Sequence, residues 1–365
     1  MNNKTQSAYL FPQNVSYSIE YQKENFWRCV YSSTSSKALH YKVVLPLYVK
    51  PVLTKQTEIE GLGITMIGLY QTTKVQAKPY LEVTIAYETI ENEINGSDWL
   101  YHILDLMGEV IIDKRVFFAE SGEYTDVLTQ KMYDSENMIS RFRVIKDSGM
   151  EAEGANFFLI KATCHKENYV VLNEDILQSI AWFTLINENE WKMAESLKSI
   201  NADSPEKFSF YYPVSWSVKQ AEDSILGLSH YTLAHIIGHK KKNMINLFFM
   251  VPGKEVTAQF ISDTMFKRLE GIFHIGSPTL KNVMNKRNVK LDQLWTAQIE
   301  INNEDKKIRN LLTLYVGCTE SLWFYFELIS PHPDQSFYDW AVNKRALEII
   351  LNSLNNFDSE FNNIG

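Results

Sequence analysis

The chain has 365 residues, of which 45% are hydrophobic and 22% are charged, and its formal net charge is −8. A chain of this length is expected to form two domains, and each half is long enough to bury a core of its own. The acidic balance disfavours nucleic acid as a partner, because such binding depends on basic residues that release counterions.

The first 37 residues have no counterpart later in the sequence. Within them, Val15–Tyr21 carries apolar residues at every second position, which predicts a half-buried strand. The pattern leaves two interpretations open for residues 1–37. They either complete the edge of a sheet or form an arm that contacts another protein.

Residues 38–190 are expected to form the first of the two domains. The pattern predicts two strands, a helix, three further strands and a closing helix. Ser97 and Asp98 precede the first helix, and both residue types favour an N-cap position. The expected strands lie at 39–45, 81–87, 124–132, 139–146 and 156–163, and the expected helices lie at 99–107 and 173–182.

A polar segment, residues 191–206, is expected to be a linker, and residues 207–365 then repeat the order of the first domain. Ser262 and Asp263 take the places of Ser97 and Asp98, at an offset of about 165 residues. Strands joined by short gaps favour antiparallel pairing. The sequence therefore predicts an α+β fold of two tandem copies, each an antiparallel sheet with helices packed on one face.

The second copy opens with a motif that points to a family. Phe208–Trp216 reads Phe-Ser-Phe-Tyr-Tyr-Pro-Val-Ser-Trp, which resembles the opening strand of PsbP/Mog-like domains. The first copy departs from this motif, because Pro46 is followed by Leu47 and Tyr48. Members of the family are mostly binding modules, and one bacterial branch resembles chaperones of type VI secretion effectors that act as dimers. The resemblance implies that a tandem duplication supplies both halves of such a dimer.

Aromatic and aliphatic residues alternate along the last strand of each copy. Trp323, Tyr325 and Ile329 share one face of that strand in the second copy, and Phe158 and Ile160 share one face in the first. An antiparallel sheet covered on one face leaves the other open, so these five residues are our candidates for a protein-binding surface. The alternative is that the two copies, or residues 1–37, bury them.

Histidines and cysteines provide the other chemical candidates. His230, His235 and His239 lie close together, but Tyr231–Ile237 reads as a strand and favours a structural role over a metal site. Cys164 and His165 are neighbours on a strand and point to opposite faces, so they cannot act as a nucleophile and its base. Cys29 and Cys318 have no evident partner. We therefore expect no catalytic residues, no metal and no cofactor.

Further signals are weaker. Gly61 and Gly63 lack the remaining residues of a nucleotide-binding loop, and the carboxylate pairs Glu123 with Asp126 and Glu151 with Glu153 are expected to be solvated. The first residues lack a basic region followed by an apolar one, so we expect no signal peptide, and no stretch approaches the roughly 18 apolar residues of a membrane span. With three cysteines, these features favour the cytoplasm.

Three functions are consistent with these features. The first is a non-catalytic protein-binding module, a chaperone or adaptor of a bacterial secretion system whose partner is a secreted effector or a component of the secretion machine. The alternative is a protein that binds a small ligand or a lipid in a cleft between the two copies. The third is an enzyme whose site is assembled across the copies around His230 and His235.

Overall fold

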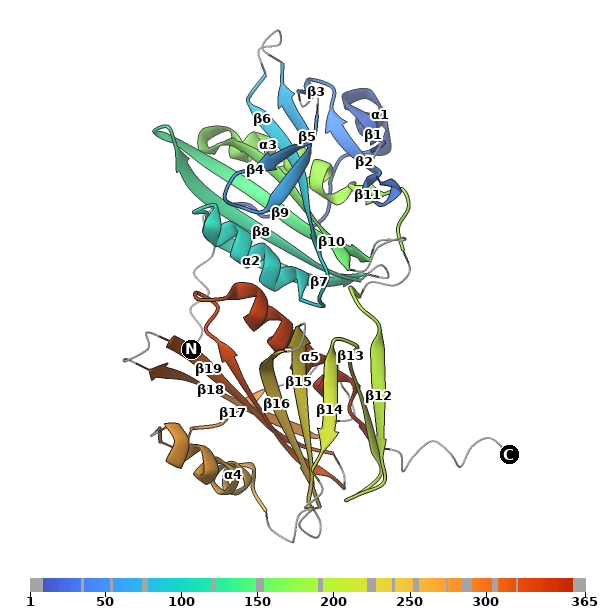
Figure 1. Cartoon of the computed structure of the whole chain (residues 1–365). Coiled ribbons are helices and arrows are strands. Elements are labelled where there is room, and N and C mark those ends of the chain that lie inside the picture. Colours follow the sequence, from blue (N-terminus) through green and yellow to red (C-terminus); the bar gives the residue numbers. More distant parts are fainter. Residues whose placement is uncertain are drawn as a thin grey trace, which may run out of the picture. The chain divides into compact units, whose positions relative to one another are not determined.

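The chain divides into two compact units with a boundary between Ala194 and Glu195, and residues 92–94 group with the second unit. Figure 1 shows the computed structural model. It describes residues 9–33, 36–52, 55–73, 78–119, 122–148, 154–189, 193–221, 228–237, 240–251, 256–273, 275–276, 278–283, 291–303, 308–319 and 321–356.

The first unit contains a small sheet and a large sheet. The small sheet has the order β1-β2-β11, and the large sheet has the order β3-β5-β6-β10-β9-β8-β7, with β4 paired to β5. The strands are β1 (Phe26–Tyr31), β2 (Tyr41–Pro46), β3 (Val49–Pro51), β4 (Thr57–Ile59), β5 (Ile64–Thr72), β6 (Leu81–Ile90), β7 (Val110–Ala119), β8 (Gly122–Tyr133), β9 (Glu136–Ser148), β10 (Ala155–His165) and β11 (Thr184–Leu185). The helices are α1 (Ile19–Asn25), α2 (Gly96–Leu106) and α3 (Tyr169–Ala181), with short 3-10 turns at Lys37–Leu39 and Lys166–Asn168.

The second unit has the same arrangement of strands. Its small sheet has the order β12-β13-β21, and its large sheet has the order β14-β15-β16-β20-β19-β18-β17. The strands are β12 (Leu197–Ala202), β13 (Phe208–Pro213), β14 (Trp216–Gln220), β15 (Leu228–Ile237), β16 (Lys240–Met250), β17 (Lys281–Val283), β18 (Gln293–Asn303), β19 (Ile308–Cys318), β20 (Trp323–Pro331) and β21 (Asn355–Asn356). The helices are α4 (Ala258–Phe273) and α5 (Phe337–Ser353).

The expected mixture of helices with antiparallel sheets is confirmed. In each large sheet the chain leaves an inner strand, β6 or β16, through a helix and reaches the far edge at β7 or β17. Three strands then lead back to the inner strand, where β10 pairs with β6 and β20 pairs with β16, both antiparallel. The two units therefore share one strand order.

The sequence predicts that the helices of each unit pack on one face of the sheet. In the structure they pack on both faces. In the first unit, Trp99 of α2 contacts Phe157 of β10, with ring centroids 5.5 Å apart. Ile176 of α3 instead belongs to the buried cluster that contains Phe158 and Val43 of the small sheet. Because Phe157 and Phe158 are neighbours on a strand, they point to opposite faces. We call these the α2 face and the α3 face of the large sheet (Figure 1).

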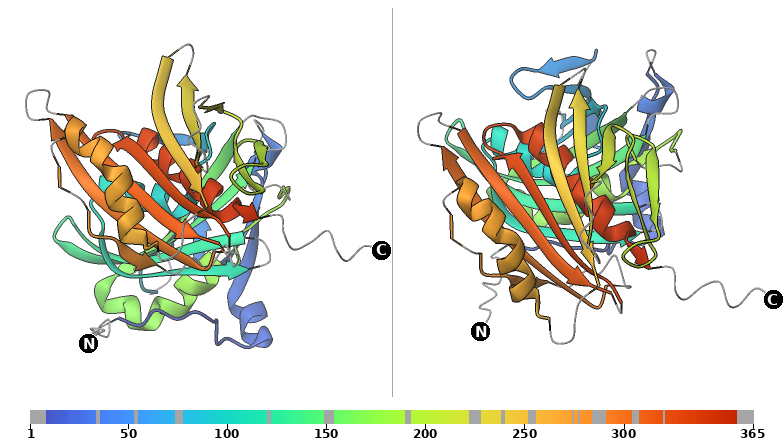
Figure 2. Two further views of the ribbon diagram at one scale, coloured as in Figure 1. Left: turned by 90° about the horizontal axis from the view of Figure 1, so that it is seen from below. Right: turned by 60° about the horizontal axis from the view of Figure 1, so that its bottom comes forward.

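The second unit is covered on both faces in the same way (Figure 2). Phe266 of α4 packs in a buried cluster with Tyr325 of β20. The neighbouring residue Phe326 contacts Phe249, on which Phe208 of the small sheet stacks. Helix α5 contacts β13 and β20. Both faces of each large sheet are therefore covered by other elements. We call the face of the second large sheet that packs against α4 the α4 face.

Parts of residues 1–37 and of the expected linker 191–206 form strands of the two units. Residues 26–31 form β1, which pairs with β2, and residues 197–202 form β12, which pairs with β13. Residues 26–31 thus do have a counterpart, because β1 and β12 occupy the same place beside the second strand of each small sheet. The expected linker 191–206 contains β12, which pairs with one edge of β13.

Two local predictions were wrong because other residues than expected cap the starts of helices α1 and α4. The segment predicted as a strand at 15–21 instead runs into helix α1, where the side chain of Ser18 accepts a hydrogen bond from Tyr21 N. Helix α4 begins at Ala258, ahead of Ser262, and Thr257 Oγ1 accepts a hydrogen bond from Phe260 N. Ser262 is fully buried inside the helix.

No helix among the described residues is both long and apolar enough to span a bilayer. The helices instead use their apolar sides within the units. The clusters around Phe158 and around Tyr325 each combine residues of a helix with residues of the large sheet.

The core of the first unit allows a first prediction. Phe158 is fully buried in the α3-face cluster, so we expect Phe158→Ala to lower the free energy of unfolding by about 3–5 kcal/mol. Val171 lies on α3 and is 72% exposed, and Val171→Ala is the matched control with little effect. Urea denaturation of both variants checks this, and equal losses would contradict the assignment of Phe158 to the core.

Candidate functional site

A row of polar residues crosses five adjacent strands of the first unit. Gln71 pairs with Glu82, Glu82 with Thr163, Thr163 with Ser140, and Ser140 with Thr129. Residues directly opposite on neighbouring strands point to the same face. The row lies on the α2 face, because Thr163 is an even number of residues from Phe157 on β10.

This polar row forms the floor of a pocket with a volume of about 460 Å³. Four members of the row line the pocket, namely Gln71, Glu82, Ser140 and Thr163. The walls are formed by Tyr80, Glu109, Lys131, Tyr133, Met138 and Lys161. Pockets of this size hold small molecules.

Hydrogen bonds within the pocket hold the floor in place. The hydroxyl groups of Ser140 and Thr163 are 2.8 Å apart. Glu82 Oε2 accepts a hydrogen bond from Tyr80 OH at 2.7 Å and one from Gln71 Nε2 at 2.8 Å. Burial and the hydrogen bond to Glu82 raise the pKa of the Tyr80 phenol, so this hydroxyl remains a donor at neutral pH.

Two lysines and two carboxylates balance the charge of the pocket. Glu109 is buried, accepts a hydrogen bond from Thr129 Oγ1 at 2.6 Å, and lies 3.6 Å from Lys161 Nζ. Lys131 Nζ donates to the carbonyl oxygen of Met107 at the end of α2. An ammonium group has three protons to donate, so both lysines can still donate to a bound molecule.

The second unit has no row of this kind in the part of the chain that the structure describes. Thr232, Asn246 and Glu327 cross three strands on the α4 face, but the row continues with the apolar residues Leu314 and Ala297. Asn246 Nδ2 donates to Glu327 Oε1 at 2.6 Å, and Arg268 of α4 donates to Glu327 Oε2 at 2.6 Å. The shared strand order therefore does not require a polar floor.

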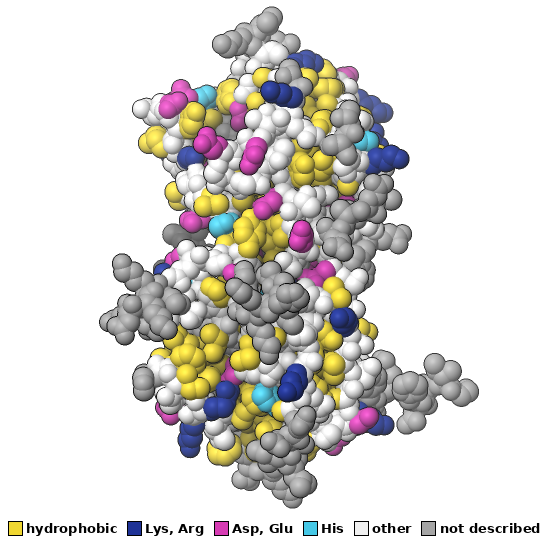
Figure 3. Space-filling model, viewed as in Figure 1, with side chains coloured by type: hydrophobic (Ala, Val, Ile, Leu, Met, Phe, Trp, Pro, Cys, Tyr) yellow, Lys and Arg dark blue, Asp and Glu magenta, His cyan; other side chains and the backbone are white. Residues whose placement is uncertain are grey.

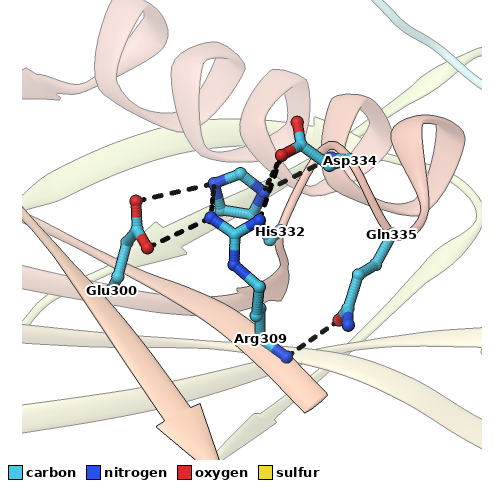
Figure 4. A network of polar contacts seen from close by, with 5 residues as sticks. All are labelled: Glu300, Arg309, His332, Asp334 and Gln335. Atoms are coloured by element: carbon cyan, nitrogen blue, oxygen red, sulfur yellow. Dashed lines mark hydrogen bonds and ion pairs between the residues drawn. The ribbon is translucent and has the colours of Figure 1, made fainter. Parts of the chain in front are cut away.

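A surface network in the second unit joins strands to the turn before α5 (Figure 4). Arg309 donates to Glu300 Oε2 at 3.2 Å and to Asp334 Oδ2 at 3.1 Å. His332 Nδ1 lies 3.3 Å from Asp334 Oδ2, and Gln335 accepts a hydrogen bond from Arg309 N. Glu300 and Asp334 are exposed. The network fixes the turn against β18 and β19, and its groups are engaged with one another.

The residues predicted to form an open aromatic face do not form one. Phe158, Ile160 and Tyr325 are fully buried, while Trp323 and Ile329 are partly buried against the α4-face cluster. The expectation failed because helices cover both faces of each large sheet. Phe158 and Ile160 also lie on the face shared with the small sheet, whereas Tyr325 lies on the face covered by α4.

The two histidine candidates that the structure describes, His230 and His235, lie on opposite faces of β15. His230 stacks on Phe248 and His235 stacks on Trp216. These histidines are five positions apart on β15, so they point to opposite faces. His239 lies outside the described residues. No group of three potential metal ligands occurs among the residues that the structure describes.

The environment of Cys164 does not suit a catalytic thiol. It is fully buried in the α3-face cluster, and burial raises the pKa of its thiol to about 12. His165 lies 3.2 Å from Glu136 instead. The thiol therefore stays protonated at neutral pH and acts as a small apolar group.

Asp126 is buried, although its sequence context suggested a solvated carboxylate. It accepts hydrogen bonds from Arg143 Nε at 2.5 Å and from Arg141 Nε at 3.2 Å on the α3 face. Burial alone would raise the pKa of Asp126, but the hydrogen bonds and charges of the two arginines outweigh it and lower the pKa. The side chain of Glu123 and residues Glu151 and Glu153 lie outside the described part.

No motif in the sequence identifies the pocket. Its floor combines residues from five strands, and the polar positions 71, 82, 129, 140 and 163 are separated by long intervals. Only the strand register brings them into one row. Small polar residues within the predicted strands, such as Ser140 between Ile139 and Arg141, were the signal available in the sequence.

Comparisons with known proteins find little similarity in sequence. No protein-family model matches the chain, and no curated protein matches it. Among solved structures, the chain is similar to LpqN, described as involved in cell envelope biogenesis of Mycobacterium tuberculosis, with 8% identity, a TM-score of 0.32, and coverage of 46% of this chain and 96% of LpqN. It is also similar to the cyanobacterial PsbP (CyanoP) of Synechocystis sp. PCC 6803, with 11% identity, a TM-score of 0.29, and coverage of 44% and 92%. These likenesses do not assign the chain to a family.

The hydroxyl pair in the floor can be tested by a double-mutant cycle. Ser140→Ala and Thr163→Val each remove one partner of a buried hydrogen bond, so we expect a coupling energy of about 0.5–1.5 kcal/mol in urea denaturation. Ser140→Ala combined with Thr313→Val of the second unit is the control, and these changes should add. Full additivity in the first pair would contradict the hydrogen bond.

The ion pairs of Asp126 predict a dependence of stability on pH. Because the folded-state pKa is lowered, the stabilisation is present above the unfolded pKa of about 3.9 and is lost as the pH falls through the lower folded value. Asp126→Asn should cost about 3–5 kcal/mol at pH 7, since it leaves buried arginines without their carboxylate. The difference from the wild type should shrink below about pH 4. A difference that does not change with pH would argue against these ion pairs.

Proposed function

We propose that this chain is a non-catalytic binding protein whose first unit holds a small polar molecule in the pocket on its α2 face. The supporting observation is the polar row of five strands that forms the pocket floor. Buried polar groups on a sheet face reduce stability unless they are satisfied. Their presence at one pocket, and the apolar residues that interrupt the comparable row of the second unit, support a role in recognition.

The groups in the pocket suit binding better than catalysis. The carboxylate of Glu82 is held by Tyr80 and Gln71, and the Ser140 hydroxyl is bonded to that of Thr163. A nucleophile needs a neighbouring base that can accept its proton, and this hydroxyl pair has no such base within hydrogen-bond distance among the described residues. The rigid floor instead presents donors and acceptors in fixed positions.

The charges in the pocket favour a ligand with an acidic group and several hydroxyl or amide groups. Glu82 and Glu109 are already bonded to protein donors, whereas Lys131 and Lys161 keep free protons. The ammonium groups would therefore contact the acidic group. The hydroxyls of Ser140 and Thr163 and the amide of Gln71 would contact the uncharged part.

A second candidate function, a protein-binding module, is favoured by the edge strand β7. Val110, Ile111, Val116 and Phe117 on this strand are exposed by 67%, 41%, 48% and 37%, and β7 ends the order of the large sheet. An exposed apolar edge strand can pair with an extended segment of a partner. Figure 3 shows apolar side chains interspersed with charged ones on the face in view.

In its specific form, this second candidate is a cytoplasmic chaperone or adaptor of a bacterial secretion system. The support is the resemblance of Phe208–Trp216 to the opening strand of PsbP/Mog-like domains. The identical strand order of the two units is also what a tandem duplication of one such domain would produce. The partner would then be a secreted effector or a component of the secretion machine.

Native mass spectrometry of the gently purified chain tests the main proposal. We expect a small-molecule adduct on the wild-type chain that Lys131→Met loses, because this change removes an ammonium group from the pocket and keeps most of its volume. Lys114→Met removes the same charge from the exposed part of β7 and should keep the adduct. A wild-type chain without an adduct, or equal adducts on both variants, would contradict the pocket as a binding site.

The same preparation distinguishes the second candidate. A co-purifying protein that is lost in Val116→Lys, with thermal stability unchanged, would favour partner binding at the β7 edge. The charged side chain on an exposed edge strand disfavours pairing with another strand.

A further inference from the structure

Three arginines gather on the α3 face, opposite the pocket. Arg115 of β7 lies directly across from Asp126 of β8, and Asp126 lies directly across from Arg143 of β9. Arg141 is two residues before Arg143 and therefore points to the same face. Three guanidinium groups thus surround one carboxylate.

The carboxylate is shared by two of the arginines. Asp126 accepts hydrogen bonds from Arg143 Nε and Nη2, at 2.5 and 2.9 Å, and from Arg141 Nε and Nη2, at 3.2 and 2.5 Å. Arg115 makes no ion pair among the described residues, and its Nη1 is buried without a hydrogen-bond partner. Asp113, two residues before Arg115, accepts a hydrogen bond from Lys114 N and makes no ion pair with the arginines in the described part of the chain.

The cluster therefore carries two more positive charges than negative ones. Arg141 and Arg143 are 2% and 8% exposed and Asp126 is 1% exposed, whereas Arg115 is partly exposed, so water screens the charges of the three buried groups only weakly. Buried charges are normally paired with opposite charges. Arg115 Nη1 is buried and has no hydrogen-bond partner, beside a carboxylate that two other arginines share, so a bound anion would neutralise charge that the described residues leave unpaired.

The N-terminal segment covers the cluster. The ring centroid of Phe11 lies 4.2 Å from Arg115 Cζ and 4.6 Å from Arg141 Cζ. The carbonyl oxygen of Pro12 accepts a hydrogen bond from Arg141 Nη1 at 2.7 Å. The face of an aromatic ring attracts a cation but supplies less stabilisation than a charged partner. The contact with the Phe11 ring therefore stabilises the Arg115 guanidinium group less than an ion pair with an anion would.

One side of the cluster carries an aromatic pair. Phe117 and Tyr124 stack with ring centroids 5.6 Å apart, and Arg143 Cζ lies 5.1 Å from the Phe117 ring. Phe117 is 37% exposed, so this side is accessible from solvent. The Phe11 ring lies over the Arg115 guanidinium group.

We propose that Arg115, Arg141 and Arg143 form an oxyanion site for a phosphate group, and that Phe11 closes this site when it is empty. The planar forks of guanidinium groups match the oxygen atoms of a phosphate. Two negative charges on the phosphate balance the excess charge of the cluster. The exposed ring of Phe117 provides a stacking surface for the organic part of a phosphate ester. This site lies on the opposite face from the pocket and does not depend on the proposed ligand there.

Isothermal titration with inorganic phosphate, against chloride at equal ionic strength, tests the site in the full chain. The wild type should bind phosphate with one saturable site. Arg115→Gln should bind at least tenfold more weakly. Lys114→Gln removes the same charge from the neighbouring position, which points to the α2 face, and should bind as the wild type does.

Two further variants separate recognition from general charge and from folding defects. Phe11→Ala removes the ring over the guanidinium groups and should bind phosphate at least threefold more tightly. Arg115→Lys keeps the charge without the fork and should fall between the wild type and Arg115→Gln. Absence of saturable binding in both the wild type and Phe11→Ala would overturn the proposal, as would equal weakening in Arg115→Gln and Lys114→Gln.

Discussion

The antiparallel register of β5, β6, β10, β9 and β8 is the constraint on which the first unit depends. It places Gln71, Glu82, Thr163, Ser140 and Thr129 in one row. A slip of one residue would turn every side chain of a strand to the other face. Such a slip would move hydroxyl groups into the apolar cluster around Phe158, so the apolar packing of one face enforces the polar arrangement of the other.

The strand β9 shows how one segment serves two chemically different surfaces. Ser140 faces the pocket, where two lysines balance two glutamates. Arg141, the next residue, faces the cluster around Asp126, where positive charge is in excess. The alternation of side chains along a strand thus allows a balanced polar surface and a cationic one to share a single layer of backbone.

The sequence predicted the positions of the strands and helices better than it predicted which faces of the sheets are covered. The alternation of apolar residues identified several inner strands, including β15 and β20, but not β5, and it predicted three strands after the first helix of each unit where the structure has four. It did not reveal that both faces are covered, because Tyr325 and Phe158 would look the same under a helix or in contact with a partner. It also missed the edge strand β7, whose central Asp113 and Lys114 interrupt the apolar pattern.

The candidate sites were harder to predict for a physical reason. Thr163 and Ser140 are 23 positions apart, and Arg115 and Arg143 meet only because β8 pairs with both of their strands. Contacts of this kind depend on register, which a single sequence does not reveal. The histidines around 230–239 attracted attention because they are close in sequence, and the strand then directed His230 and His235 to opposite faces.

The small sheet of the first unit has a consequence for protein synthesis. Its central strand β2 lies between β1, which precedes it, and β11, which is formed by Thr184–Leu185 at the end of the unit. A nascent chain on the ribosome cannot complete this sheet until Leu185 has left the exit tunnel. Until then, β2 keeps one open edge. The edge of β2 at Tyr41 and Lys42 therefore stays open to other strands for most of the translation of the first unit.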